Sequence, residues 1–287
     1  MNKLIGILLM LAALPAQSAP DAQVQAVQMP AWLQRGENKT PLRVGTALRN
    51  GDMLVSGANA RVYVQTADGS TVKLGENATL RLEGLSQQKA EESLFSAVLD
   101  VAKGAFRFTT AGLSKLAARE VTVKVAGATI GIRGTDVWGK DGSEQGVVCL
   151  IEGKISVTGP DSKDFVMDQP LSFYKMPKGE APLPVAPVDA QQLQEWAQET
   201  DIARPAARIG GKWKVDLLTA PDQASAVLAY DQWRAAGYDV RLNPVAKAEG
   251  GWVYTLRIAQ LPSRAEAQKL AEQLKGTLGA DSPGVSR

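Results

Sequence analysis

The fold of the C-terminal quarter is decided by two stretches with one pattern, WKVDLLTAPDQASAVLAYDQW (residues 213–233) and YTLRIAQLPSRAEAQKLAEQL (residues 254–274), which start 41 residues apart. In each stretch, apolar residues first alternate with polar ones, as in a half-buried strand. They then recur at spacings of three and four residues, as on one face of a helix. A proline followed by an N-cap residue, Asp222 or Ser263, marks each helix start, and Glu266 gives the second copy the pattern of a capping box.

With a further strand over 240–242, these halves predict an α+β domain of the ferredoxin-like βαββαβ type from residue 212 to residue 287. Both helices would pack on one face of a small antiparallel sheet and leave the other face open to a ligand. Alternation along the strands directs five polar side chains to that open face. They are Lys214, Asp216, Arg241, Thr255 and Arg257.

This region resembles the SPOR (sporulation-related repeat) family, whose small domains bind peptidoglycan glycan strands stripped of their stem peptides. The resemblance covers roughly residue 212 to the C-terminus and rests on the paired halves, on AAGY at 235–238 and on PSRAEA at 262–267. It implies that glycan strands are the partner and that the five polar residues bind them, since a polar outer face alone is expected of any half-buried sheet. The chain departs from the family at Asp216, where many members carry Gln, and at 259–261, where AQL replaces Gly-Pro-Phe.

Residues 30–158 have the pattern of an all-β domain, either a sandwich or a solenoid-like stack of hairpins. Short alternating runs are separated by the turn pairs NG at 50–51 and DG at 68–69 and 141–142. One such run on each side of residues 68–70 predicts a half-buried hairpin over 62–74. For residues 93–100 and 113–118, the sequence leaves open a brief helix or a loop.

The same region resembles the FecR-type periplasmic domain. The resemblance rests on GDMLVSG at 51–57, DGS at 68–70 and ATIGIRGTDV at 128–137, in that order. We interpret Arg133, Gly134, Thr135 and Asp136 as a structural motif rather than a ligand site. Arg133 and Asp136 are expected to form a charged pair at a strand end. We favour a structural role for them because such pairs more often fix register than bind substrates.

Residues 159–211 contain seven prolines, which predict an extended, semi-stiff linker. One island, residues 189–200, has the pattern of a short helix capped by Asp189, with Leu193 and Trp196 on one face. A tryptophan on a linker helix usually docks on a neighbouring domain, so we expect this helix to clasp the β domain. Binding of a partner is the less favoured interpretation.

The N-terminus has the features of a secretory signal peptide over residues 1–18. Lys3 precedes an apolar run over 4–14, and AQS at 16–18 offers small residues at a cleavage site. This run is shorter than the ~18 apolar residues that a membrane-spanning helix needs, and no other run comes close, so no transmembrane segment is expected. The protein is therefore expected in the periplasm, with an uncleaved N-terminal anchor as the minor alternative.

Composition narrows the possible chemistry. The net charge is only +2 and the basic residues are scattered, which argues against a nucleic-acid partner. The chain contains no histidine, so the commonest general base and the commonest zinc ligand are missing. We expect no catalytic residues, no metal and no cofactor. Cys149, in the apolar run VVCLI at 147–151, is expected to be a buried, unreactive core residue.

These observations predict a non-enzymatic periplasmic protein that binds peptide-free glycan strands through its C-terminal domain. The β domain would act as a scaffold or sensor for an unidentified envelope protein. One alternative is a signalling regulator of the FecR type, a role that in the family normally needs a membrane span. A cell-wall hydrolase is less favoured, because it needs two carboxylates about 5–10 Å apart and no motif marks such a pair.

Overall fold

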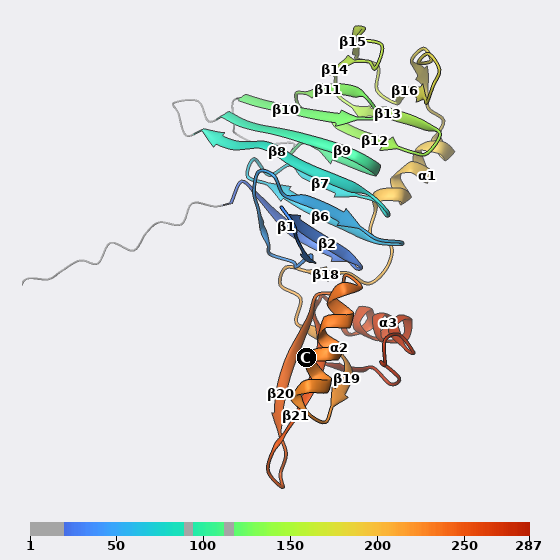
Figure 1. Ribbon diagram of the computed structural model, residues 1–287. Helices are drawn as coiled ribbons and strands as arrows, with labels where there is room; N and C mark the ends of the chain where they lie inside the picture. The colour runs from blue at the N-terminus through green and yellow to red at the C-terminus, as the bar shows by residue number, and fades with distance from the viewer. Residues whose placement is uncertain (1–19, 89–93, 112–117) are drawn as a thin grey trace, which may run out of the picture.

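The computed structural model describes residues 20–88, 94–111 and 118–287. It consists of an N-terminal β domain and a smaller C-terminal α+β domain that lies at one end of it (Figure 1). The predicted signal peptide, residues 1–18, lies outside the described residues, as do residues 112–117. In the part of the chain that is described, no helix is both long and apolar enough to cross a membrane.

The β domain consists of two facing sheets, here called sheet A and sheet B. Sheet A contains β1 (Ala22–Gln28), β4 (Ala47–Leu48), β6 (Arg61–Thr66), β7 (Thr71–Leu74), β12 (Asp136–Asp141), β13 (Gln145–Glu152), β16 (Ser172–Pro177), β17 (Ala186–Pro187) and β18 (Ala207–Arg208). Sheet B contains β2 (Ala31–Arg35), β3 (Asn38–Pro41), β5 (Met53–Ser56), β8 (Thr79–Gln88), β10 (Ala118–Val125), β11 (Ala128–Ile132), β14 (Ile155–Thr158) and β15 (Asp164–Met167).

One long strand, β9 (Leu94–Thr109), joins the two sheets. Its first part pairs with β8 and β10 in sheet B, and its last part pairs with β7 and β12 in sheet A. The change of sheet occurs near Gly104, whose φ of +85° favours glycine and where a Cβ atom would lie 2.6 Å from the Cα of Ala78. The structure therefore places residues 94–100 in a strand rather than in a brief helix or loop.

The core of the β domain lies between the two sheets. Inward-facing residues alternate along the strands, as predicted for the hairpin of β6 and β7, where Val62, Val64, Val72 and Leu74 are buried. Successive strand pairs switch from one sheet to the other along the chain, so the domain is a sandwich with solenoid-like winding (Figure 1). The predicted all-β architecture is confirmed.

The segment expected to be an extended linker is instead folded. Strands β15 and β16 extend sheets B and A, α1 (Ala190–Thr200) packs against sheet A, and β18 returns to pair with β1. The proline count was misleading because Pro177 and Pro187 lie at the end of a strand and on an edge strand, where proline is tolerated. In the structure, every second residue of β16 is buried, as expected for a strand with one face on the core.

Helix α1 clasps the β domain as predicted. The Asp189 side chain accepts a hydrogen bond from the backbone N–H of Gln192 at 2.8 Å. Trp196 stacks on Trp138 of β12 with ring centroids 4.7 Å apart and meets Phe173 edge-on at 5.6 Å. The helix thereby covers an apolar patch on the outer face of sheet A.

The C-terminal domain has the predicted βαββαβ order. Its elements are β19 (Trp213–Ala220), α2 (Gln223–Ala235), β20 (Val240–Ala246), β21 (Trp252–Leu261), α3 (Arg264–Leu274) and β22 (Gly284–Ser286). The strands form one antiparallel sheet in the order β20-β21-β19-β22. Both helices pack on one face, where Trp233 is fully buried and its indole Nε1 donates to the carbonyl oxygen of Leu278 at 3.2 Å.

Both predicted N-caps form, but the predicted capping box is only half formed. Asp222 accepts from the N–H of Ser225 at 2.8 Å, and Ser263 accepts from the N–H of Glu266 at 3.1 Å. The Glu266 carboxylate does not close the box. It accepts instead from the N–H of Ala206 at 3.2 Å and so ties α3 to the segment that leads out of the β domain.

Further contacts join the two domains. The N–H of Ala31 donates to the carbonyl oxygen of Gly237 at 3.0 Å, and Arg43 forms an ion pair with Asp239 at 3.0 Å. Gly237 has a φ of +88°, and a Cβ atom there would lie 2.6 Å from the ring of Trp32. These contacts engage the turn after α2 and not the five polar residues predicted for the open sheet face.

Candidate functional site

The candidate site is the face of the C-terminal sheet opposite to the helices. The residues between the five candidates, Val215, Leu217, Val240, Leu256 and Ile258, are buried with the helices. Strand alternation therefore places Lys214, Asp216, Arg241, Thr255 and Arg257 on the other face, where Arg241 is exposed and the rest are half-buried.

Three of the candidates form one row across three strands. Arg257 of β21 lies directly opposite Arg241 of β20 on one side and Asp216 of β19 on the other. The Nε atom of Arg257 lies 3.0 Å from Oδ1 of Asp216, and the two side chains are 20% and 28% exposed. Like charges directly opposite each other destabilise a sheet, so Asp216 offsets the repulsion between the two arginines. Asp216 thus has a structural partner as well as a place on the face.

The two remaining candidates, Lys214 and Thr255, differ in whether their side chains are already engaged by other residues. The ammonium group of Lys214 donates to the backbone oxygen of Arg287 at 2.8 Å, so it is engaged by the C-terminus. Thr255 lies between Asn243 and Thr219 on the neighbouring strands and forms a second polar row with them. The sequence reasoning missed Asn243 because the predicted strand ended at residue 242, whereas β20 continues to Ala246. It missed Thr219 because β19 contains a register shift between Asp216 and Leu218 that cannot be read from alternation alone.

The face offers one exposed guanidinium group, that of Arg241, beside a row of hydroxyl and amide groups. The Nη2 atom of Arg241 donates to Oε1 of Gln260 at 3.3 Å, which leaves further N–H donors of the guanidinium group for a ligand. Such a face can hydrogen-bond sugar hydroxyls and acetamido groups and can pair with a carboxylate. Among the described residues, no group of three or more His, Cys, Asp or Glu could hold a metal ion.

In the β domain, the predicted pair between Arg133 and Asp136 does not form. Asp136 instead accepts two hydrogen bonds from Arg107, at 2.8 Å and 2.6 Å, and one from the hydroxyl of Thr109 at 3.2 Å. The hydrogen bond to Asp136 is the main reason that the pKa of Arg107 is raised above its ordinary value. The prediction was wrong because Asp136 begins β12 in sheet A, whereas Arg133 follows β11 in sheet B.

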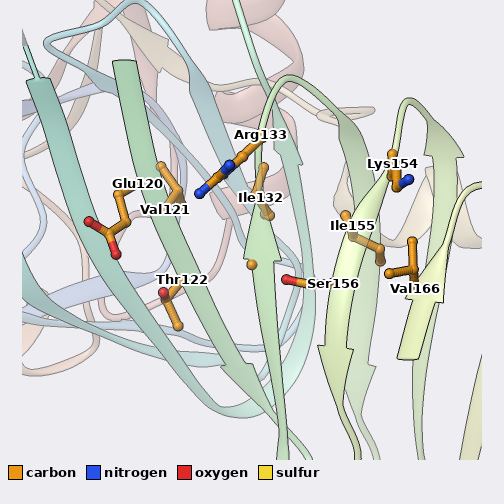
Figure 2. Close-up of a pocket in the computed structure, with 10 residues that line it drawn as sticks. Glu120, Val121, Thr122, Ile132, Arg133, Lys154, Ile155, Ser156 and Val166 are labelled. Carbon is orange, nitrogen blue, oxygen red and sulfur yellow. The ribbon is translucent and has the colours of Figure 1, made fainter. Parts of the chain in front are cut away.

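Arg133 is exposed and lines a groove of about 600 Å³ on the outer face of sheet B (Figure 2). Thr122, Gly131, Ser156 and Val166 lie side by side on β10, β11, β14 and β15 and form its floor. Glu120 and Lys154 line the groove as well. The sequence analysis contained Gly131 only within the FecR-like motif and assigned Arg133 to a charged pair, so it did not predict this groove.

Cys149 lies on the outer face of sheet A under helix α1. It is fully buried, as predicted, and burial raises the pKa of its thiol to about 12. It pairs with Trp138 and Phe173 on the neighbouring strands. A thiol with such a pKa carries almost no thiolate at neutral pH.

The fold is that of a two-domain protein in which a β sandwich is joined to a ferredoxin-like domain with an open polar sheet face. The family model described as FecR protein matches residues 52–156, and the model described as SPOR domain matches residues 210–286. The chain therefore carries a FecR domain followed by a SPOR domain. Both domains are of binding or regulatory types.

The chain is also similar to two crystal structures of a protein from Parabacteroides distasonis described as a "putative anti-sigma factor". The sequence identities are 17% and 16%, the TM-scores are 0.40 and 0.41, and each match covers 78% of this chain and 91% of the other. No curated protein matches the chain.

Proposed function

We propose that this protein is a non-enzymatic periplasmic protein that binds peptide-free glycan strands of peptidoglycan through the open face of its SPOR domain. The SPOR match over residues 210–286 supports peptidoglycan as the partner. The observation that carries the finer proposal is the row of Arg241, Arg257 and Asp216 on a sheet face that the interdomain contacts do not engage.

The charges on this row fit a strand that bears hydroxyl, acetamido and lactyl carboxylate groups. Arg241 is the exposed cation of the row, while Arg257 is partly neutralised by Asp216. A strand crossing this row would thus meet one strong charge-assisted donor and several neutral ones.

The proposal is tested by pull-down of the mature full-length chain on amidase-treated sacculi. Arg241→Ala is expected to reduce binding severalfold while leaving the melting curve unchanged, because an exposed side chain contributes little to stability. The matched control is Lys269→Ala, which removes an exposed cation from α3 on the other side of the sheet. The proposal fails if the parent does not bind, or if Arg241→Ala binds as well as Lys269→Ala.

For the β domain, we infer a role as a scaffold or sensor for an envelope protein. The FecR match over residues 52–156 also supports a second candidate, a signalling regulator of the FecR type. A photo-crosslinker at Val166, which is 51% exposed, tests both ideas in cells. Capture of a membrane-bound regulator favours signalling, whereas capture of another wall protein favours a scaffold.

Periplasmic location and cleavage of residues 1–18 belong to the same proposal. The mature protein should be released by osmotic shock with its N-terminus at or near Ala19. Recovery with Met1 in the washed membrane pellet would refute this part. A wall hydrolase would release soluble fragments from purified peptidoglycan, and we expect the mature chain to release none.

A further inference from the structure

The groove on the outer face of sheet B is created by a missing side chain. Gly131 lies in the middle of the floor, between Thr122 and Ser156 on the adjacent strands. A Cβ atom at Gly131 would collide with the hydroxyl oxygen of Ser156, so only glycine fits without a shift of the serine. The groove therefore follows from the absent side chain at Gly131 and from how closely the strands pack there.

The floor crosses four strands and changes character along its length. With strands about 4.8 Å apart, the distance from β10 to β15 is roughly 14 Å, which is enough for a short extended ligand lying across the strands. Thr122 and Ser156 supply hydroxyl groups, and Val166, 51% exposed, supplies an apolar surface at the far end.

Two exposed cations, Arg133 and Lys154, line this groove. Arg133 follows the last residue of β11 and Lys154 precedes the first residue of β14, next to the pair Ile132–Ile155. Among the described residues, neither cation has an ion-pair partner, in contrast to Arg107 and Arg257. Two cations that line the same groove favour an anionic group there.

An acid lines the β10 end of the same groove. Figure 2 shows the Glu120 carboxylate directed away from the guanidinium group of Arg133, and no ion pair joins them. A ligand lying on the floor would therefore meet a carboxylate near β10, two cations near β11 and β14, and an apolar surface at β15. That order matches an amino group, an acidic side chain and a small apolar group.

We propose that the groove is a binding site for a short acidic peptide with a free amino terminus. Its acidic side chain pairs with Arg133 and Lys154, its amino group lies near Glu120, and its apolar end packs on Val166. The floor residue Gly131 and the cation Arg133 both come from the FecR-like motif. This proposal does not rest on glycan binding by the SPOR domain.

The test is an NMR titration of the mature full-length chain with the tripeptide amides Ala-Glu-Ala and Ala-Gln-Ala. Ala-Glu-Ala is expected to shift the amide signals of Thr122, Gly131 and Ser156 and to bind roughly three- to tenfold more tightly than Ala-Gln-Ala, as for one exposed charge-assisted contact. Arg133→Gln and Lys154→Gln are each expected to remove most of this difference. Raising the salt concentration should reduce it too.

Two further variants make the test specific. Lys124→Gln removes an exposed cation from the same sheet face without touching the groove and should leave binding unchanged. Gly131→Ala combined with Ser156→Ala replaces the hydroxyl group of the floor by a methyl group without the collision and should weaken binding. The proposal is overturned if the two peptides bind equally, if Lys124→Gln weakens binding as much as Arg133→Gln, or if inorganic phosphate displaces the peptide at equal concentration.

Discussion

Two rows of side chains on different sheets of this protein differ in exposure: one is buried under a helix, and the other remains open to solvent. On the outer face of sheet A, Trp138, Cys149 and Phe173 lie side by side across three strands, and helix α1 covers them. Burying such apolar side chains is favourable by roughly 25 cal/mol for each Å² removed from water. The apolar outer face of sheet A is therefore buried by another segment of the chain, here helix α1, even though residues 159–211 around this helix are rich in proline.

On the open face of the SPOR sheet, the corresponding row is Arg241, Arg257 and Asp216. The charge of Arg257 is balanced within the row by its 3.0 Å contact with Asp216, and the groups of the row remain in contact with water. Covering them would require desolvation without an equivalent gain. The comparison shows that the composition of one cross-strand row decides whether a sheet face becomes core or remains free for a ligand.

The largest effect on stability is expected from Trp233, which packs helix α2 against the SPOR sheet. Trp233→Ala should lower the free energy of unfolding by about 3–5 kcal/mol, because it removes a fully buried ring. Urea unfolding measures the change, with Leu228→Ala, a residue 62% exposed on the same helix, as control. A loss similar to that of the control would mean that helix packing is not what supports the sheet. Loss of glycan binding in Trp233→Ala would be uninformative, since the domain itself is at risk.

A smaller effect on stability is expected when the packing of helix α1 on sheet A is weakened. Trp196→Ala removes the ring that stacks on Trp138 and should destabilise the protein by about 2 kcal/mol. It should also raise the rate at which a thiol reagent labels Cys149 without denaturant. Gln194→Ala on the exposed side of α1 is the control. An unchanged labelling rate would show that the sheet itself, and not the helix, protects the thiol.

Alkaline pH tests the same buried row by a different route. The pKa of Cys149 is raised in the folded state from about 9 to about 12, so its contribution to stability is complete below pH 9 and is lost as the pH rises toward 12. Between pH 8 and pH 10, the parent should lose about 1 kcal/mol more than Cys149→Ala. Unfolding curves of both proteins at each pH give the difference. Parallel losses would show that the thiol is not desolvated.

The smallest effect on stability is expected on the open face. Asp216→Gln removes one member of a half-buried ion pair and should change the free energy of unfolding by less than about 1 kcal/mol. It should strengthen binding to peptide-free glycan strands, because Arg257 is then free to pair with lactyl carboxylates. Pull-down on amidase-treated sacculi measures this. Weaker binding would show that Asp216 itself contacts the ligand or positions Arg257 for it.

The sequence predicted the SPOR domain in most of its detail because its signals are local. N-caps, helix faces and strand alternation are read from neighbouring residues, and Asp222 and Ser263 cap their helices as expected. The pairing of Glu266 with Ala206 was missed, since it joins residues 60 positions apart. The partner of Asp136 was missed for the same reason, because Arg107 comes from another strand of sheet A.

The candidate site was predicted in part. Alternation placed the five polar residues on one face, but only the register between strands shows that Asp216 lies opposite Arg257. The irregularity next to Asp216 prevents this register from being counted along the chain. The groove at Gly131 depends on four strands at once, and no single stretch of sequence carries that information.

The pairing of β18 with β1 has a mechanical consequence. Ala207 and Arg208 lie against Val27 and Ala26, and the SPOR domain begins a few residues later. If the SPOR domain is held by the wall, as proposed, tension along the chain would reach the sandwich first at β18 and then at its partner β1. The ion pair of Arg43 with Asp239 lies in parallel with this link, so the load is shared and not concentrated on one peptide segment. Under the proposed function, a stretching wall would therefore load β1 through its pairing with β18.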